Sequence, residues 1–135
     1  GENMNSSRLI KLIIDSYINE KKFIINHPNS IRDYLYVDDF CLVLINILKN
    51  YKKFDDEILN ISSHNWIKNH LLIEKLNKLF GKNKNIILKK NKQKEKMNSL
   101  FSDGNKVKLK LKNIRYTNFE KAIINTFDFY GIKKL

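Results

Sequence analysis

Apolar residues recur at helical spacing in three segments of the 135-residue sequence. In residues 8–20, 67–80 and 119–130 they lie three or four positions apart, which predicts amphipathic helices. Gly81 directly follows the second segment, where glycine commonly ends a helix. Residues 117–120 have the S/T-x-x-E spacing of a capping box, which predicts the start of the last helix.

A fourth segment, residues 40–49, is apolar on almost every side. This composition predicts a helix that is buried around most of its circumference. Asp38 and Asp39 precede it, and acidic side chains suit the N-cap and first turn of a helix. The only cysteine, Cys41, lies in this helix and is expected to be a core residue. A single cysteine excludes a disulfide within the chain.

Short runs of β-branched and aromatic residues predict strands at residues 23–25, 31–37, 57–62 and 86–88. The only proline, Pro28, marks a turn between the first two runs, which are therefore predicted to pair with each other. Short strands combined with four to five helices predict an α/β fold.

Length and composition predict one domain over residues 1–135 with a core of its own, because 42% of the residues are hydrophobic. The longest apolar run is too short to span a bilayer, and no signal peptide opens the sequence. We therefore expect a cytoplasmic protein without a membrane partner.

The chain is strongly basic, with 26 lysines and arginines, 14 acidic residues and a net charge of +12. Such a charge is typical of nucleic-acid-binding proteins. However, only Arg8, Arg32 and Arg115 are arginines, and arginine is the residue that forks phosphates and base edges. We therefore expect no nucleic-acid partner, whereas an anionic ligand such as a nucleotide diphosphate fits the charge.

Arg32, Tyr34 and Tyr36 share one face of the predicted strand 31–37. Residues 32–39 read R-D-Y-L-Y-V-D-D. They resemble the R-D-[FY]-x-[YH]-V-x-D signature of NAD-dependent nucleotide-sugar epimerases and dehydratases, which are extended short-chain dehydrogenases/reductases. The signature lies in the carboxyl-terminal, substrate-binding half of those enzymes. The resemblance implies that Arg32 binds the diphosphate of a nucleotide sugar.

Further motifs follow in the order that the family has. Arg8 begins an R-L-I step that resembles [KR]-L-I-P, which contributes to substrate binding in some members. In the family, a second cation reaches the diphosphate from about ten residues before a D-x-S-K step. Here that cation is a lysine within residues 92–96, and we choose Lys94. The resemblance thus implies three substrate-binding residues, Arg32, Arg8 and Lys94.

Two more segments carry the resemblance with departures. Residues 59–62, L-N-I-S, resemble a Y-N-I-G strand, and residues 101–106 resemble the D-x-S-K step that opens a short helix. Residues 107–111 alternate apolar side chains with lysines, which by itself predicts a strand. We give the resemblance more weight and predict a helix over residues 103–111, with Asp103 as its N-cap.

The cofactor half of the family is not recognisable in this sequence. Its Gly-rich turn binds a pyrophosphate at a helix N-terminus, whereas the four glycines here lie far apart in the sequence. The catalytic tyrosine–lysine pair of the family would lie upstream of residue 1. His64 and His70 have no partner at metal-ligand spacing. We therefore assign no catalytic, cofactor-binding or metal-binding residue, and NAD or NADP would belong to the full-length enzyme.

The chain is thus expected to be a carboxyl-terminal portion of a longer enzyme, excised or truncated, without its Rossmann half. We favour a nucleotide-sugar 4,6-dehydratase over an epimerase, because residues 28–32 resemble an N-P-x-[AS]-x-R run. The alternatives are a small basic module that binds nucleic acid or an acidic protein, and a degenerate remnant. Helices 8–20 and 40–49 should expose apolar surface, which predicts self-association, for example as a homo-oligomer, or partial rearrangement.

Overall fold

The computed structural model describes residues 7–89 and 99–135. Five α-helices, one short 3-10 helix and four short strands lie within these ranges. In chain order they are α1 (Leu9–Ile18), β1 (Phe23–Ile25), β2 (Ile31–Asp33), α2 (Val37–Lys49), η1 (Tyr51–Lys53), β3 (Trp66–Lys68), α3 (Asn69–Phe80), β4 (Ile86–Leu88), α4 (Asn105–Lys110) and α5 (Phe119–Phe129).

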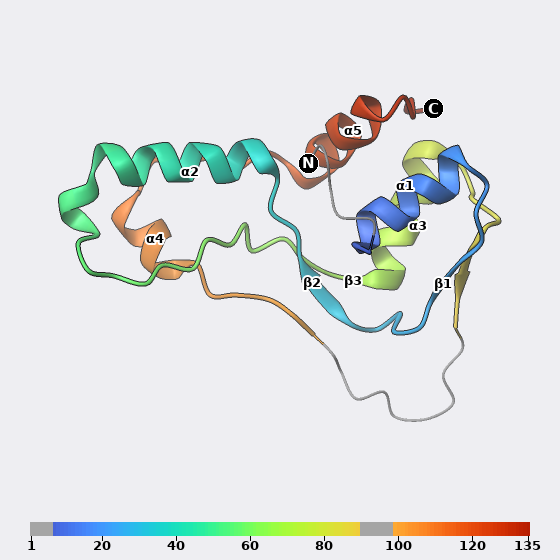
Figure 1. Cartoon of the computed structure of the whole chain (residues 1–135), viewed down its shortest axis with the longest axis horizontal. Helices are drawn as coiled ribbons and strands as arrows, with labels where there is room; N and C mark the ends of the chain where they lie inside the picture. Colours follow the sequence, from blue (N-terminus) through green and yellow to red (C-terminus); the bar gives the residue numbers. More distant parts are fainter. Residues whose placement is uncertain (1–6, 90–98) are drawn as a thin grey trace.

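Helices α1, α3 and α5 gather at one end of the molecule with β1 and β4, and we call this region the body (Figure 1). Its core contains completely buried side chains from all three helices, including Ile13, Leu72 and Phe127. The Phe127 ring stacks on Phe80 at 4.5 Å between centroids and meets the edge of Tyr17 at 5.9 Å. The three helices predicted from apolar spacing are therefore confirmed.

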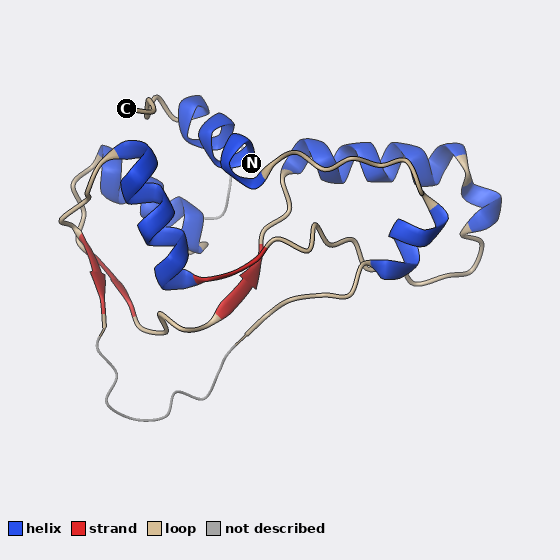
Figure 2. Cartoon of the chain, turned by 180° about the vertical axis from the view of Figure 1, so that it is seen from behind, coloured by secondary structure: helices blue, strands red, loops and turns tan. Residues whose placement is uncertain are grey.

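The four strands form two separate two-stranded sheets (Figure 2). β1 pairs in parallel with β4, and β2 pairs antiparallel with β3. The predicted pairing of residues 23–25 with residues 31–37 is wrong, because each strand finds its partner much later in the chain. Strand β2 also ends at Asp33 rather than at residue 37.

Helix α2 begins at Val37, so the signature residues 32–39 span a strand, a connection and the first turn of a helix. Asp38 and Asp39 lie in that first turn, as predicted, but Tyr36 occupies the N-cap position. The acidic side chains therefore face the positive end of the helix dipole without capping it.

Helices α2 and α4 and η1 form a second region, which we call the arm and which projects away from the body (Figure 1). A small cluster of four buried residues joins its elements: Val43, Phe54, Val107 and Leu111. Most other apolar residues of α2 are exposed, and Cys41 is exposed as well. The predictions of a largely buried α2 and of a core cysteine are therefore wrong, whereas the predicted apolar surface is confirmed on this helix.

Three local predictions in and around the arm meet different outcomes. Residues 57–62 form no strand, and Ile58 is 91% exposed. Residues 105–110 are helical, as the resemblance implied, although Gly104 rather than Asp103 is the N-cap. Asn118, not the first residue of the predicted capping box, caps α5 by accepting from two backbone amides. None of the described helices is long and apolar enough to cross a membrane.

Candidate functional site

Arg32 occupies the middle of β2 between two neighbouring segments. Its backbone lies opposite Ile67 of β3 on one side and makes a parallel bridge to Leu100 on the other. Backbone hydrogen bonds from Leu100 to Ile31, at 3.0 Å, and from Asp33 to Leu100, at 3.2 Å, hold this second contact. The half-buried Arg32 side chain donates from Nη1 to the Ile31 carbonyl oxygen at 2.9 Å. The positively charged side chain of Arg32 is thus carried by a strand that pairs with a neighbouring segment on each of its two edges.

Three of the segments that carry the resemblance meet next to Arg32. The hydroxyl of Ser62, which is 1% exposed, donates to the carboxylate of Asp33 at 2.5 Å. Ser63 donates to the Tyr34 carbonyl oxygen at 2.7 Å. Gly104 packs so closely on Ser62 that a Cβ placed there would lie 3.0 Å from the serine Cβ and backbone nitrogen. The signature, the L-N-I-S segment and the segment before α4 therefore form one contiguous unit.

The last acid of the signature links α2 to the start of α5. Asp39 is 4% exposed and accepts from the Thr117 backbone amide at 3.0 and 3.1 Å. The Thr117 hydroxyl donates to the same carboxylate at 2.8 Å. Hydrogen bonds to an ionised acceptor are stronger than neutral ones, so this contact fixes the arm to the body.

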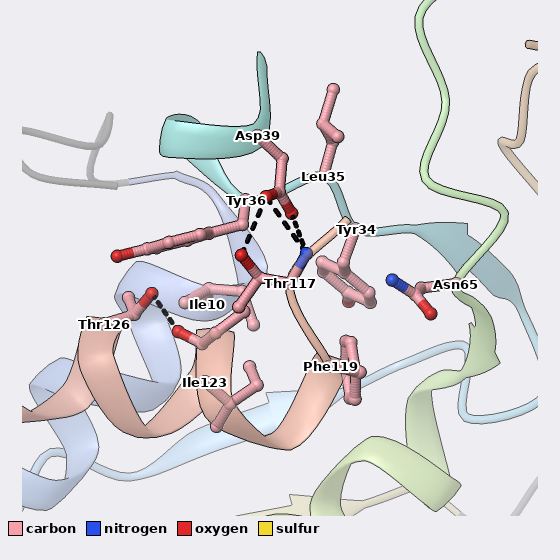
Figure 3. A pocket seen from close by; sticks show the side chains of 11 residues that line it. Ile10, Tyr34, Leu35, Tyr36, Asp39, Asn65, Thr117, Phe119, Ile123 and Thr126 are labelled. Carbon is pink, nitrogen blue, oxygen red and sulfur yellow. Dashed lines mark hydrogen bonds between the residues drawn. The ribbon is translucent and has the colours of Figure 1, made fainter. Parts of the chain in front are cut away.

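A cavity of about 120 Å³ lies beside this contact (Figure 3). It is lined by residues of α1, α2 and α5, of the β2–α2 connection and of the segments before β3 and α5: Ile10, Tyr34, Leu35, Tyr36, Asp39, Asn65, Thr117, Phe119, Ala122, Ile123 and Thr126. Ligand pockets usually measure about 300–1,000 Å³, so this cavity suits only a small part of a ligand. Asn65 and Phe119 also line a more open hollow of about 420 Å³ beside Trp66.

Tyr34 adds a buried polar group to the lining of the cavity. Burial raises the pKa of its phenol far above the usual value, and the positive charge of Arg32 lowers it only in part. The hydroxyl is therefore a neutral donor at physiological pH. It is buried without a hydrogen-bond partner among the described residues. The Tyr34 ring packs against Phe119 at 6.2 Å between centroids.

The predicted site residues are only partly brought together. Arg8 is exposed at the N-cap of α1, and Arg32 is half-buried on β2. Neither lines the cavity, although Ile10 and Tyr34, two residues after each of them, do. Lys94 lies outside the described residues. Sequence reasoning had singled out the two tyrosines of the signature but missed Thr117, which it had assigned to a cap.

The three glycines within the described ranges lie in separate places of the fold. Gly81 and Gly131 follow α3 and α5 with φ of 83° and 81°, a region that favours glycine. Gly104 makes the close contact with Ser62. Within residues 7–89 and 99–135, no group of three His, Cys, Asp or Glu side chains is placed to hold a metal ion.

No protein-family model and no curated protein sequence matches the chain. Solved structures, however, match its fold. A dTDP-glucose 4,6-dehydratase from Bacillus anthracis str. Ames in complex with NAD has a TM-score of 0.78 at 23% identity, and the match covers 97% of this chain and 41% of that one. A UDP-glucuronic acid 4-epimerase from Bacillus cereus in complex with UDP-glucuronic acid and NAD has a TM-score of 0.80 at 19% identity, and the match covers 97% of this chain and 42% of that one.

A GDP-L-fucose synthetase from Naegleria fowleri bound to NADP matches with a TM-score of 0.72 at 15% identity, over 95% of this chain and 41% of that one. The chain therefore spans about two-fifths of the length of these structures. At these identities the likeness concerns the fold. The chain shares the fold of a part of these dehydratase, epimerase and synthetase structures.

Proposed function

We propose that this chain is the substrate-binding portion of an NAD-dependent nucleotide-sugar 4,6-dehydratase or epimerase, and that Arg32 binds the diphosphate of the nucleotide sugar. The observation that carries the proposal is the position of Arg32. It sits in a strand held on both edges, in a signature whose other segments pack around it, within a fold shared with such enzymes.

Arginine suits this role for geometric reasons. Its guanidinium can donate two parallel hydrogen bonds to two phosphate oxygens, which the single ammonium of lysine cannot do with the same geometry. The net charge of +12 also attracts an anionic ligand at a distance. Tyr34 and Tyr36, which follow Arg32 in the signature, line the adjacent cavity, and the Tyr34 hydroxyl has no partner among the described residues and could donate to a small polar part of the ligand.

In this proposal the chain binds the substrate and carries out no catalytic step by itself. In the complete enzyme, NAD would supply the hydride acceptor, and a cofactor-binding portion would supply the catalytic residues. Arg8 and Lys94 stay proposed as secondary phosphate contacts. We keep the preference for a dehydratase over an epimerase, which rests on residues 28–32.

Titration of the 135-residue chain with UDP, dTDP and GDP, followed by NMR, tests the proposal. We expect weak binding of at least one diphosphate, and Arg32→Lys should weaken it about ten- to a hundredfold, because a charge-assisted hydrogen bond contributes roughly 1.5–3 kcal/mol. Arg115→Lys is the matched control, since Arg115 is exposed and belongs neither to the surroundings of Arg32 nor to the lining of the cavity. NAD should not bind at micromolar affinity.

Two results would contradict the proposal. One is diphosphate binding that Arg32→Lys leaves unchanged while thermal stability falls, since Arg32 would then be structural. The other is tight, steeply salt-dependent binding of a DNA duplex, which would favour a basic nucleic-acid-binding module instead.

A further inference from the structure

The arm contains a hollow that the proposed function does not use. It lies between one flank of α2, η1 and residues 110–114, and its volume is about 500 Å³. Ligand pockets usually measure about 300–1,000 Å³, so the size suits a whole small ligand. The hollow shares no lining residue with the cavity beside Tyr34 or with the hollow beside Trp66. We call it the arm hollow.

The charged side chains that line the arm hollow are three lysines, and no acidic residue of the described chain joins them. Lys110 is held in place, because its ammonium donates to the Lys53 carbonyl oxygen and to Glu57, each at 2.6 Å. Glu57 also pairs with Lys106 at 3.7 Å, so two lysines share its negative charge. Lys53 and Lys112 are exposed, and their ammonium groups have no partner among the described residues. Two cations are therefore available to a ligand.

The α2 side of the arm hollow offers hydrogen-bond acceptors. The side-chain nitrogen of Asn46 donates to the Leu42 carbonyl oxygen at 2.8 Å. That of Asn50 donates to the Asn46 carbonyl oxygen at 2.9 Å. One donor of each amide is used in this way, whereas the side-chain oxygens remain as acceptors, which suit hydroxyl groups. Leu42, Leu111 and Ile114 add apolar surface to the lining, against which C–H groups can pack.

We propose that the arm hollow binds a small hydroxylated anion of the class of phosphorylated monosaccharides. The phosphate contacts the ammonium groups of Lys53 and Lys112, and the hydroxyl groups contact the side-chain oxygens of Asn46 and Asn50. A neutral polypeptide segment in the same place would bury two lysine charges without an acid, which is unfavourable. This site goes beyond the proposed function, because Arg32 takes no part in it.

NMR titration of the 135-residue chain with glucose 6-phosphate, inorganic phosphate and glucose tests the proposal. The ionic strength is held constant, because salt screens exposed charges. Glucose 6-phosphate should shift the backbone amides of residues 46–53 and 110–114 in a saturable way. The dissociation constant should be on the order of 1 mM, since contacts with exposed charges are weak. Phosphate should bind the same residues more weakly, and glucose should cause no shifts at equal concentration.

Lys112→Glu should weaken binding of glucose 6-phosphate about tenfold or more, because it replaces an attraction by a repulsion. Lys108→Glu is the matched control: it makes the same change of charge at an exposed position of α4 outside the hollow. Asn46→Ala should weaken binding of glucose 6-phosphate and leave that of phosphate unchanged. Arg32→Lys should change neither, which separates this site from the proposed diphosphate site.

Three results would overturn the proposal. The first is the absence of saturable shifts up to about 20 mM glucose 6-phosphate. The second is equal weakening by Lys108→Glu and Lys112→Glu, which would show attraction to the overall charge of the chain. The third is a set of shifts centred on Arg32 and Tyr34, which would assign the ligand to the diphosphate site. Circular dichroism establishes that each variant is folded.

Discussion

The body and the arm use similar helices in different ways. In the body, α1, α3 and α5 enclose ten buried hydrophobic residues, several of them at 0% exposure. In the arm, α2 is the longest helix of the described chain and yet joins a cluster of only four buried residues. The apolar residues of the body are therefore satisfied within this chain, whereas those of the arm are satisfied on one side only.

This difference shows where the stability and the functional contacts of the protein should be sought. Stability comes mainly from the body, because the free energy of hydrophobic burial grows with the area removed from water. Arg32 on β2, and the two tyrosines of the connection to α2, lie where the arm leaves the body (Figure 1). Arg8 lies in the body, at the start of α1. Substitutions in the body, at the joint and in the arm should therefore have separable effects.

The largest effect is expected from Phe127→Ala in the body. Phe127 is completely buried against Phe80 and Tyr17, and truncating such a ring costs about 3–5 kcal/mol in the free energy of unfolding. Urea denaturation followed by circular dichroism measures it. Phe129→Ala, on an exposed neighbour in the same helix, should cost about 1 kcal/mol or less. Equal losses would show that burial of Phe127 in the core of the body does not account for the stability.

A smaller effect is expected from Asp39→Ala at the joint. The substitution leaves the amide and hydroxyl of Thr117 without their acceptor, which should cost about 2–3 kcal/mol. Amide hydrogen exchange should rise in α2 more than in α3, because the arm loses its attachment while the body keeps its core. Asp38→Ala, on an exposed acid, should cost less than about 1 kcal/mol. Unchanged protection of α2 would refute the proposed link.

The smallest effect is expected from Gly104→Ala, where α4 meets the segment next to β2. Its φ of −93° suits any residue, so the cost arises only from the contact of the new Cβ with Ser62 at 3.0 Å. Crowding of this kind costs about 1–2 kcal/mol. Thermal denaturation measures it, and diphosphate binding should weaken as well because Ser62 holds Asp33 beside Arg32. No change in either quantity would show that the segment can shift freely.

Local patterns predicted the body better than the arm. Helical spacing located α1, α3 and α5, because each buries one apolar face within this chain. The same reasoning wrongly predicted that α2 is buried around most of its circumference. A run of apolar residues shows that a helix can be buried, but not that the described chain supplies a partner for each of its faces. Residues 57–62 illustrate the same limit, because a strand needs a neighbour and the described chain provides none there.

Long-range pairing was the other source of error. β1 and β4 lie about sixty residues apart, and no local pattern reveals that they pair. For α4, the resemblance predicted a helix correctly where alternation suggested a strand, and Leu109 accordingly stays 71% exposed. Arg32 and the two tyrosines could be singled out from the signature. The contact between Asp39 and Thr117 could not, because these residues lie 78 positions apart.

The central claim is that Arg32 binds the diphosphate of a nucleotide sugar, and a crystal structure of the chain with the tightest-binding of UDP, dTDP and GDP tests it most directly. The account predicts a diphosphate with two oxygens within about 3 Å of the Arg32 guanidinium nitrogens, near Tyr34. A diphosphate bound instead among the exposed lysines of α4, with the Arg32 side chain still turned to its own backbone, would contradict the account.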